Sequence, residues 1–326
     1  MRKTCRTLLL STALLAAGTL AARAEAPDVV VSIKPIHSLV SAIMQGVGEP
    51  KLIVEGAASP HTYSLKPSNA AALQDADVIF WVGHGMEAFL EKPLETLGGE
   101  ATVVELDDAP GLEKLPFREG GPFEPHVHEG EDDHDHAHEE HAHDEDDHDH
   151  EHGVYDMHLW LSADNARAIA AEAARVLSQE DPDNAETYGK NLAALNDRLA
   201  ALDKEIAGTV APVKDKPFIV FHDAYQYFEH RYGVHAAGSI TVSPETLPGA
   251  ERLTQIHDKV KSLGATCVFA EPQFEPKLVN VVIEGTPAKS GTLDPEAATL
   301  DPGPDLYFTL MKGIAGSLRD CLGGAS

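Results

Sequence analysis

The sequence has few basic residues and very little cysteine. It contains 25 Lys and Arg against 53 Asp and Glu, and 3 cysteines in 326 residues. Such an excess of negative charge repels nucleic acid and anionic membranes and attracts cations, so we expect no nucleic-acid partner. The cysteines are far apart and form no Cys-x-x-Cys pair, which disfavours a metal site built from thiolates.

Long hydrophobic runs are absent after the first 24 residues. At the start of the chain, three basic residues precede an uncharged stretch at 7–22, and Ala22 and Ala24 are small residues two apart. This pattern predicts a secretory signal peptide at 1–24, with cleavage before Glu25. A transmembrane anchor needs about 20 apolar residues, and this stretch is shorter and is interrupted by polar residues. We therefore expect an exported protein with no direct membrane insertion.

Two cysteines remain after removal of the signal peptide. Cys5 is lost with it, whereas Cys267 and Cys321 stay in the mature chain. An even pair of cysteines in an oxidising compartment favours a disulfide. Closing a loop of that length stabilises a fold by about 4 kcal/mol on the chain-entropy model. The alternative, that both cysteines bind metal, is disfavoured by their separation.

Short β-branched runs alternate with helical patterns along most of the chain, which is typical of parallel β-sheets built from βα units. The runs form two groups, so we expect an α/β fold of two lobes whose parallel sheets are flanked by helices. The first group comprises residues 29–33, 51–54, 78–82 and 102–106, and the second comprises 218–221, 267–270 and 289–293.

One long helix is predicted between the two groups of strands. Apolar residues recur every three or four positions from 184 to 210, so one face of this helix is buried along its whole length. A helix of that size extends about 40 Å and would join the lobes rigidly. We therefore expect an N-terminal lobe at 25–182, a linker helix at 183–211 and a C-terminal lobe at 212–326.

The composition changes abruptly at residues 126–152. This segment holds ten histidines and thirteen Asp and Glu, and it has no Lys, Arg or aromatic residue. It cannot build a core, so we expect a disordered loop. A solvated acidic linker would not need ten imidazoles, and the pattern favours a low-affinity, metal-collecting tract. Its histidines are His126, His128, His134, His136, His138, His141, His143, His148, His150 and His152.

Three histidines outside this loop stand at the ends of predicted elements. His61 follows the strand at 51–54, His158 precedes a helix, and His222 ends the strand at 218–221. Ligands of open α/β sheets bind outside the carboxyl ends of the strands. Imidazole suits Zn²⁺, whereas Mn²⁺ prefers carboxylate and water, and Cu²⁺ and Ni²⁺ are not excluded. For His37 and His84 a surface role is the favoured interpretation, and an accessory metal site is the alternative.

With their flanking residues, these stretches resemble the zinc-specific solute-binding proteins of ABC transporters, the ZnuA type of the cluster A-I family. The resemblance covers nearly the whole mature chain, and its motifs are specific in combination. They are Ser32-Ile-Lys-Pro-Ile-His37, Ser59-Pro-His-Thr-Tyr-Ser-Leu-Lys-Pro-Ser68, Met157-His-Leu-Trp160, Phe221-His-Asp-Ala-Tyr-Gln-Tyr-Phe228, Cys267-Val-Phe-Ala-Glu-Pro-Gln-Phe274 and Gly291-Thr-Leu-Asp-Pro295.

The resemblance implies two α/β lobes joined by a long helix, with a zinc ion in the interlobe cleft and a His-rich loop beside it. It also implies a disulfide between Cys267 and Cys321. Carried over by position, His61, His158 and His222 are the zinc ligands. Some relatives have a glutamate just before the first histidine, where this chain has Pro60. The fourth ligand is then water or Asp294, which matches an aspartate of manganese-binding relatives. If water is the ligand, we expect Asp294 to lie next to the metal ligands without binding the ion.

The function implied by the resemblance is that of a monomeric periplasmic receptor that captures Zn²⁺ with high affinity. It would deliver the ion to the membrane subunit of an ABC permease, and it would not be an enzyme. One alternative is a periplasmic zinc buffer or chaperone that serves no transporter. Another is a zinc-dependent hydrolase, which also needs three histidines and an open position, but the sequence has no His-Glu-x-x-His motif.

Overall fold

The computed structural model describes residues 26–118, 123, 155–241, 243–244, 247–264 and 266–324. The expected signal peptide at 1–24 and the histidine-rich loop at 126–152 lie outside these residues. Within them, no helix is both long enough and apolar enough to cross a membrane.

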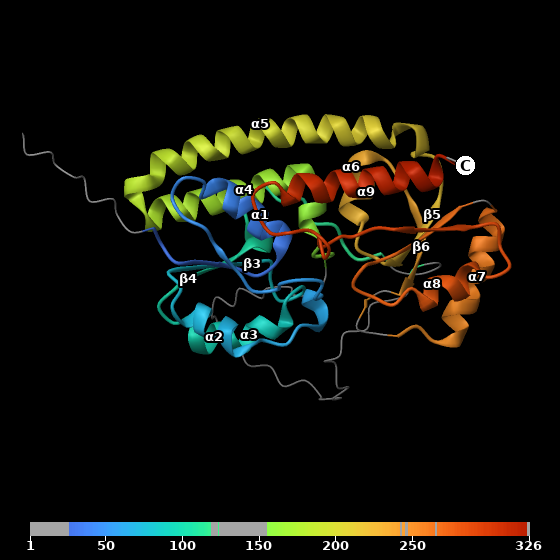
Figure 1. Ribbon diagram of the computed structural model, residues 1–326, viewed down its shortest axis with the longest axis horizontal. Coiled ribbons are helices and arrows are strands. Elements are labelled where there is room, and N and C mark those ends of the chain that lie inside the picture. Colours follow the sequence, from blue (N-terminus) through green and yellow to red (C-terminus); the bar gives the residue numbers. More distant parts are fainter. Residues whose placement is uncertain are drawn as a thin grey trace, which may run out of the picture.

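The first sheet has four parallel strands in the order β2-β1-β3-β4. They are β1 (Val29–Val31), β2 (Lys51–Leu52), β3 (Val78–Trp81) and β4 (Thr102–Glu105). Strands β1 and β3 are buried throughout, as expected for a sheet covered on both faces. In Figure 1, α2 (Pro67–Gln74) and α3 (Glu91–Leu97) lie on one side of this sheet, and α1 (Lys34–Ile43) and α4 (Ala163–Glu180) on the other.

The second sheet is also parallel and has the order β6-β5-β7-β8. Its strands are β5 (Phe218–His222), β6 (Ala236–Thr241), β7 (Cys267–Ala270) and β8 (Lys289–Thr292). Its helices are α6 (Gln226–Tyr232), α7 (Ala250–Leu263), α8 (Lys277–Ile283) and α9 (Leu306–Leu322).

Strand β5 shows how the second sheet is buried on both faces. Phe218 and Val220 belong to the main hydrophobic core, which also contains the apolar face of α9. Ile219 and Phe221 point the other way, into a smaller cluster with residues of α7 and α8. Successive side chains of a strand point to opposite faces of the sheet. Alternate residues of β5 therefore pack against helices on opposite sides.

The predicted long helix is α5 (Ala185–Val210), 26 residues long. Its buried face consists of Tyr188, Leu195, Leu199, Leu202, Ile206 and Val210. In Figure 1 it extends along one side of the molecule past both sheets. Helices α1, α4 and α9 pack against it. The expectation of two parallel-sheet halves and a long joining helix is therefore confirmed.

One continuous core connects the two halves. It contains residues of β1, β3, α1, α4 and α5 together with residues of β5, β7 and α9. The C-terminal helix α9 contributes to both halves, because the backbone N–H of Tyr307 donates to Oγ of Ser38 at 3.0 Å. The hydroxyl of Tyr307 donates to the carbonyl of Trp160 at 2.7 Å. The lobe boundaries given above remain predictions.

All seven predicted strands occur, and β6 was missed. Its sequence, Ala-Ala-Gly-Ser-Ile-Thr, has few of the β-branched and aromatic residues that mark a strand. The pairing register of β6 with β5 shifts between Phe218 and Val220. Strand β6 lies at an edge of its sheet, and its pairing with β5 rather than its composition defines it.

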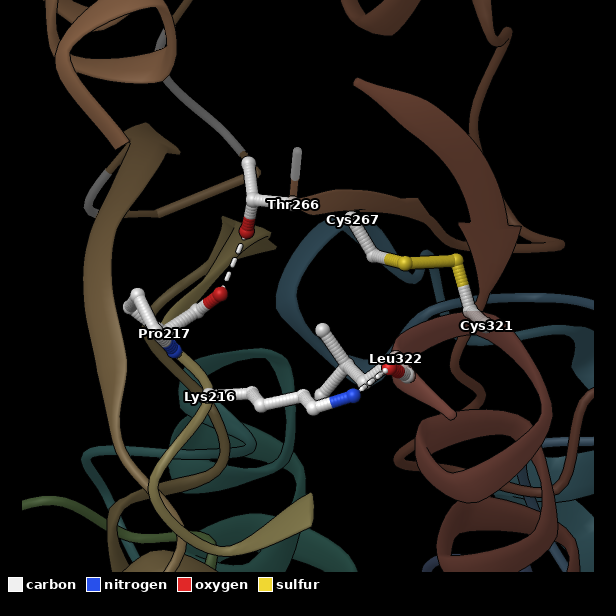
Figure 2. The surroundings of a disulfide bond; sticks show 6 residues. All are labelled: Lys216, Pro217, Thr266, Cys267, Cys321 and Leu322. Carbon is white, nitrogen blue, oxygen red and sulfur yellow. Dashed lines mark hydrogen bonds between the residues drawn. A yellow bond between two sulfur atoms is a disulfide. The ribbon is translucent and has the colours of Figure 1, made fainter. Parts of the chain in front are cut away.

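The predicted disulfide between Cys267 and Cys321 is present. Figure 2 shows that it links the start of β7 to the end of α9. Beside it, Nζ of Lys216 donates to the carbonyl of Leu322 at 2.6 Å, and the hydroxyl of Thr266 donates to the carbonyl of Pro217. The C-terminal helix is thus fixed at its last turn to the second sheet.

Candidate metal centre

Three histidines from distant parts of the chain meet between the two sheets. His61 lies in the short 3-10 helix η1 (Pro60–Thr62) that follows β2. His158 immediately precedes the 3-10 helix η4 (Leu159–Leu161). His222 is the last residue of β5. Each offers a ring nitrogen, and these three nitrogens all lie within 4.8 Å of one another.

The spacing of two of these nitrogens fits a tetrahedral zinc ion. Nε2 of His158 and Nε2 of His222 are 3.3 Å apart. Zinc–nitrogen bonds of about 2.0–2.1 Å in tetrahedral geometry require an edge of about 3.3 Å between ligand atoms. The ring of His61 has its centroid 5.5 Å from that of His158 and 5.7 Å from that of His222. The three rings therefore surround one small volume.

Two buried carboxylates orient two of the rings. Nδ1 of His158 lies 2.7 Å from Oδ1 of Asp156. Nδ1 of His222 lies 2.8 Å from each carboxylate oxygen of Glu271. An ionised carboxylate only accepts hydrogen bonds, so Nδ1 carries the proton and Nε2 keeps its lone pair for a metal. Carboxylate–histidine pairs of this kind are typical of zinc sites.

Sequence reasoning missed both carboxylates. Asp156 lies two residues before His158, and its own pKa is raised by burial to about 6. Glu271 follows β7, the neighbour of β5 in the sheet. The carboxyl ends of adjacent parallel strands meet at one edge, so a glutamate just after β7 could have been paired with His222 at the end of β5.

Burial acts differently on the three imidazoles. Loss of solvent lowers the pKa of His61 well below its usual value, and the neighbouring histidines lower it further. Burial likewise lowers the pKa of His158, with a smaller effect of His222. Burial is also the largest single effect on His222, but the attraction of Glu271 and other carboxylates outweighs it and raises the pKa. His61 and His158 are thus held as neutral imidazoles, the form that binds metal.

The acidic residue predicted as a possible fourth ligand has other contacts. Oδ1 of Asp294 accepts from the backbone N–H of Ala298 at 3.0 Å and of Glu296 at 3.3 Å. Oδ2 accepts from the N–H of Thr299 at 3.4 Å. Asp294 is not in the group of described ligand atoms that includes the histidines. It holds a turn of backbone.

Glu296, two residues further on, lies beside His61. Its Oε1 is 3.9 Å from Nε2 of His61, and the side chain is only 5% exposed. Burial raises the pKa of Glu296 well above its usual value, and nearby acidic groups such as Glu271 raise it further. Sequence reasoning did not single out this residue.

The two candidates for an accessory site lie apart from the histidine cluster. His37, on α1, has Nε2 2.9 Å from the carbonyl of Pro50. His84 lies beside Glu91, with 3.6 Å between Nδ1 and a carboxylate oxygen. A second group of possible ligands among the described residues is Glu105, Asp107 and Asp108, of which the two aspartates also pair with Lys114 at 3.7 and 3.6 Å.

Known proteins match this chain over nearly its whole length. A family model described as "Zinc-uptake complex component A periplasmic" matches residues 29–321. The high-affinity zinc uptake system protein ZnuA of Brucella abortus (strain 2308) is 60% identical over 308 residues, which cover 91% of this chain and 92% of that protein. The protein of the same name from Paracoccus denitrificans (strain Pd 1222) is 41% identical over 318 residues, 97% of this chain and 98% of its own.

The structure also resembles a solved one. A crystal structure of ZnuA aligns with a TM-score of 0.72 and 27% sequence identity. The alignment covers 91% of this chain and 99% of that one.

Proposed function

The chain belongs to the ZnuA family of periplasmic zinc-uptake components, and from this premise we propose that it captures Zn²⁺ between its two sheets and delivers it to the membrane subunit of an ABC permease. The observation that carries the proposal is the convergence of His61, His158 and His222, two of them held by buried carboxylates, on one small volume. Zinc is the cargo of this site, and the protein is a transport component rather than an enzyme.

The chemistry of the site supports zinc as its cargo. Three neutral imidazoles are borderline-soft donors that suit Zn²⁺ better than Mn²⁺, which prefers carboxylate and water. Two of the three ligands are shielded from bulk solvent, since His158 is 5% and His222 2% exposed. Copper and nickel bind imidazole as well, so their relative supply also determines which ion is captured.

The cellular setting follows from the same premise. We propose that residues 1–24 export the chain and that the mature protein works in the periplasm as a monomer. Its strong negative charge favours cations and disfavours nucleic acid as a partner.

Growth under zinc limitation tests the transport role against that of a zinc buffer. A strain that lacks this chain should stop growing in medium with a zinc chelator and should recover when zinc is added, because uptake depends on the receptor. Expression of the wild-type chain should restore growth, and expression of a His222→Ala variant should not. Normal growth of the deletion strain in chelated medium, with normal zinc uptake, would instead support a buffer that serves no transporter.

We further propose that the tract at 126–152 collects zinc weakly before the ion reaches the buried site. Ten imidazoles interspersed with carboxylates can hold several zinc ions without a fixed geometry.

Deleting 126–152 should lower the number of weakly bound zinc ions and leave the tight ion in place. Isothermal titration calorimetry of the deletion variant, compared with the full chain, measures both classes of site. A matched control replaces the ten histidines by asparagine and keeps the length and the acidic residues. Loss of the tight ion in either variant would mean that this tract supplies a primary ligand.

A further inference from the structure

We propose that Arg118 is a positioning residue of the metal centre, which joins the two halves and keeps His158 and His222 at the spacing that zinc requires. The inference rests on the proposed function and adds to it the residue that holds two ligands from different halves in place. His158 lies in the segment that leads into α4, and His222 ends β5 of the second sheet. Their Nε2 atoms are 3.3 Å apart, so a small shift of one half against the other would spoil the pair.

The guanidinium of Arg118 binds two carboxylates of the second half. Nε of Arg118 donates to Oδ2 of Asp223 at 3.1 Å, and Nη2 donates to Oδ1 of the same residue. Nη1 and Nη2 donate to the two carboxylate oxygens of Glu229, each at 2.9 Å. Both carboxylates are buried. The planar guanidinium matches a carboxylate with two parallel bonds, and such charge-assisted bonds are the strong ones.

The contact with Asp223 connects Arg118 to the first of the two ligands. Asp223 directly follows His222 at the end of β5, so a fixed carboxylate at this position restrains the end of the strand that carries the ligand. Glu229, on α6, also accepts from the backbone N–H of Ala236 at the start of β6, at 2.8 Å. Arg118 is therefore bound to two neighbouring strands of the second sheet.

The segment that carries Arg118 also lies beside the one that carries His158. The backbone N–H of Asp156 donates to the carbonyl of Leu115, three residues before Arg118, at 2.9 Å. Asp156 in turn holds Nδ1 of His158 at 2.7 Å. Arg118 is therefore connected to the second ligand through one short stretch of backbone and one carboxylate.

These two adjacent segments are fixed to both halves of the molecule. The hydroxyl of Tyr227, on α6, accepts from the N–H of Leu115 at 3.0 Å and donates to the carbonyl of Asp156 at 2.7 Å. On the other side, Asn165 of α4 accepts from the N–H of Glu113 at 2.9 Å and donates to its carbonyl at 3.0 Å. The ion pairs of Arg118 thus lie where the first half is attached to the second, next to the metal centre.

The charge of Arg118 makes its role testable by the direction of the effect. If the guanidinium acted only through its charge, it would repel Zn²⁺, and its removal would tighten zinc binding. Removal would also leave Asp223 and Glu229 as buried carboxylates without their cation, which attract a metal ion and destabilise the fold. If Arg118 positions the ligands, its removal weakens zinc binding. The two roles therefore predict opposite changes in affinity.

The test compares substitutions of Arg118 with a matched substitution of Arg231. Arg118→Ala should bind zinc about tenfold more weakly in a competition titration with a chromophoric chelator, as expected for a residue that orients metal ligands. Arg118→Lys keeps the charge but loses the paired geometry, so it should show a smaller loss, and it covers the case in which the alanine variant does not fold.

The matched control, Arg231→Ala, removes an arginine of the same helix α6 that also pairs with two carboxylates. These are Asp164 of α4, at 2.8 Å, and Asp203 of α5, at 2.5 Å. Neither aspartate adjoins a histidine of the triad, so this variant should bind zinc like the wild type.

Crystal structures of zinc-free wild type and zinc-free Arg118→Ala provide the second readout. The Nε2 atoms of His158 and His222 should lie farther apart in the variant. An unchanged distance, unchanged or tighter zinc binding by the folded variant, or an equal loss of affinity in Arg231→Ala overturns the inference and leaves the histidine site intact. Failure of the wild type to bind zinc tightly would instead refute the proposed function.

Discussion

Replacing His61 with Ala should weaken zinc binding by more than about a hundredfold, because the variant loses one of three imidazole donors and the cavity it leaves admits water. The rings of His158 and His222 are each held through Nδ1 by a buried carboxylate, and both contacts stay in place when His61 is replaced. The substitution should therefore leave these two rings in their orientation. The dissociation constant is measured by competition with a chromophoric zinc chelator.

The matched control is His230→Ala, since His230 has a side chain that is 59% exposed and lies outside the triad. This variant should bind zinc as tightly as the wild type. Wild-type affinity in the folded His61→Ala variant would show that the buried triad is not the tight zinc site.

Replacing both Cys267 and Cys321 with Ser should lower the free energy of unfolding of the zinc-free protein by about 4 kcal/mol. The bond closes a loop of 54 residues, and its loss restores conformational entropy to the unfolded chain. Urea denaturation of the zinc-free variant and wild type measures the difference. Zinc affinity should change little, because neither cysteine belongs to the histidine cluster.

Wild-type protein unfolded in the presence of a reducing agent provides the control for the serine substitutions, and it should match the double variant. A difference in unfolding free energy below about 1 kcal/mol would contradict this prediction, because it would mean that the unfolded chain is held compact without the bond.

The elements that the sequence predicted well are those with a strong local pattern. Helix α5 carries apolar residues at a helical period, and the buried strands are short apolar runs rich in β-branched and aromatic residues. Strand β6 has no such pattern, and its pairing with β5 defines it. Local composition therefore predicts strands that are rich in β-branched residues and misses one made of small residues.

In the site, too, the sequence predicted the residues with a local pattern and missed those defined by contacts in space. The sequence predicted the three histidines because each lies at or near the end of an element, and ligands of α/β sheets bind at the carboxyl ends of the strands. These residues are His61, His158 and His222. That these histidines bind zinc remains a prediction. Glu271 supports His222 through space from 49 residues away, which a local pattern does not reveal.

The sequence did not distinguish Asp294 from Glu296 as the acidic neighbour of the histidines. Both carboxylates lie in the same turn, and the motif drew attention to Asp294. Glu296 is the one that lies beside His61. Ala297, the next residue, has a positive φ, and an alanine gives no sequence signal for that conformation.

The continuous core has a consequence for how cargo leaves. Swinging the two halves apart like a clamshell would expose the apolar surface that α5 and α9 share with α1, and it would separate the ammonium of Lys34 from its three carbonyls. The segment that carries His61 is more exposed, since most of residues 55–66 are partly or fully accessible to solvent. Opening the two halves would therefore cost both apolar burial and hydrogen bonds, so we expect zinc-free and zinc-loaded protein to share the same arrangement of sheets.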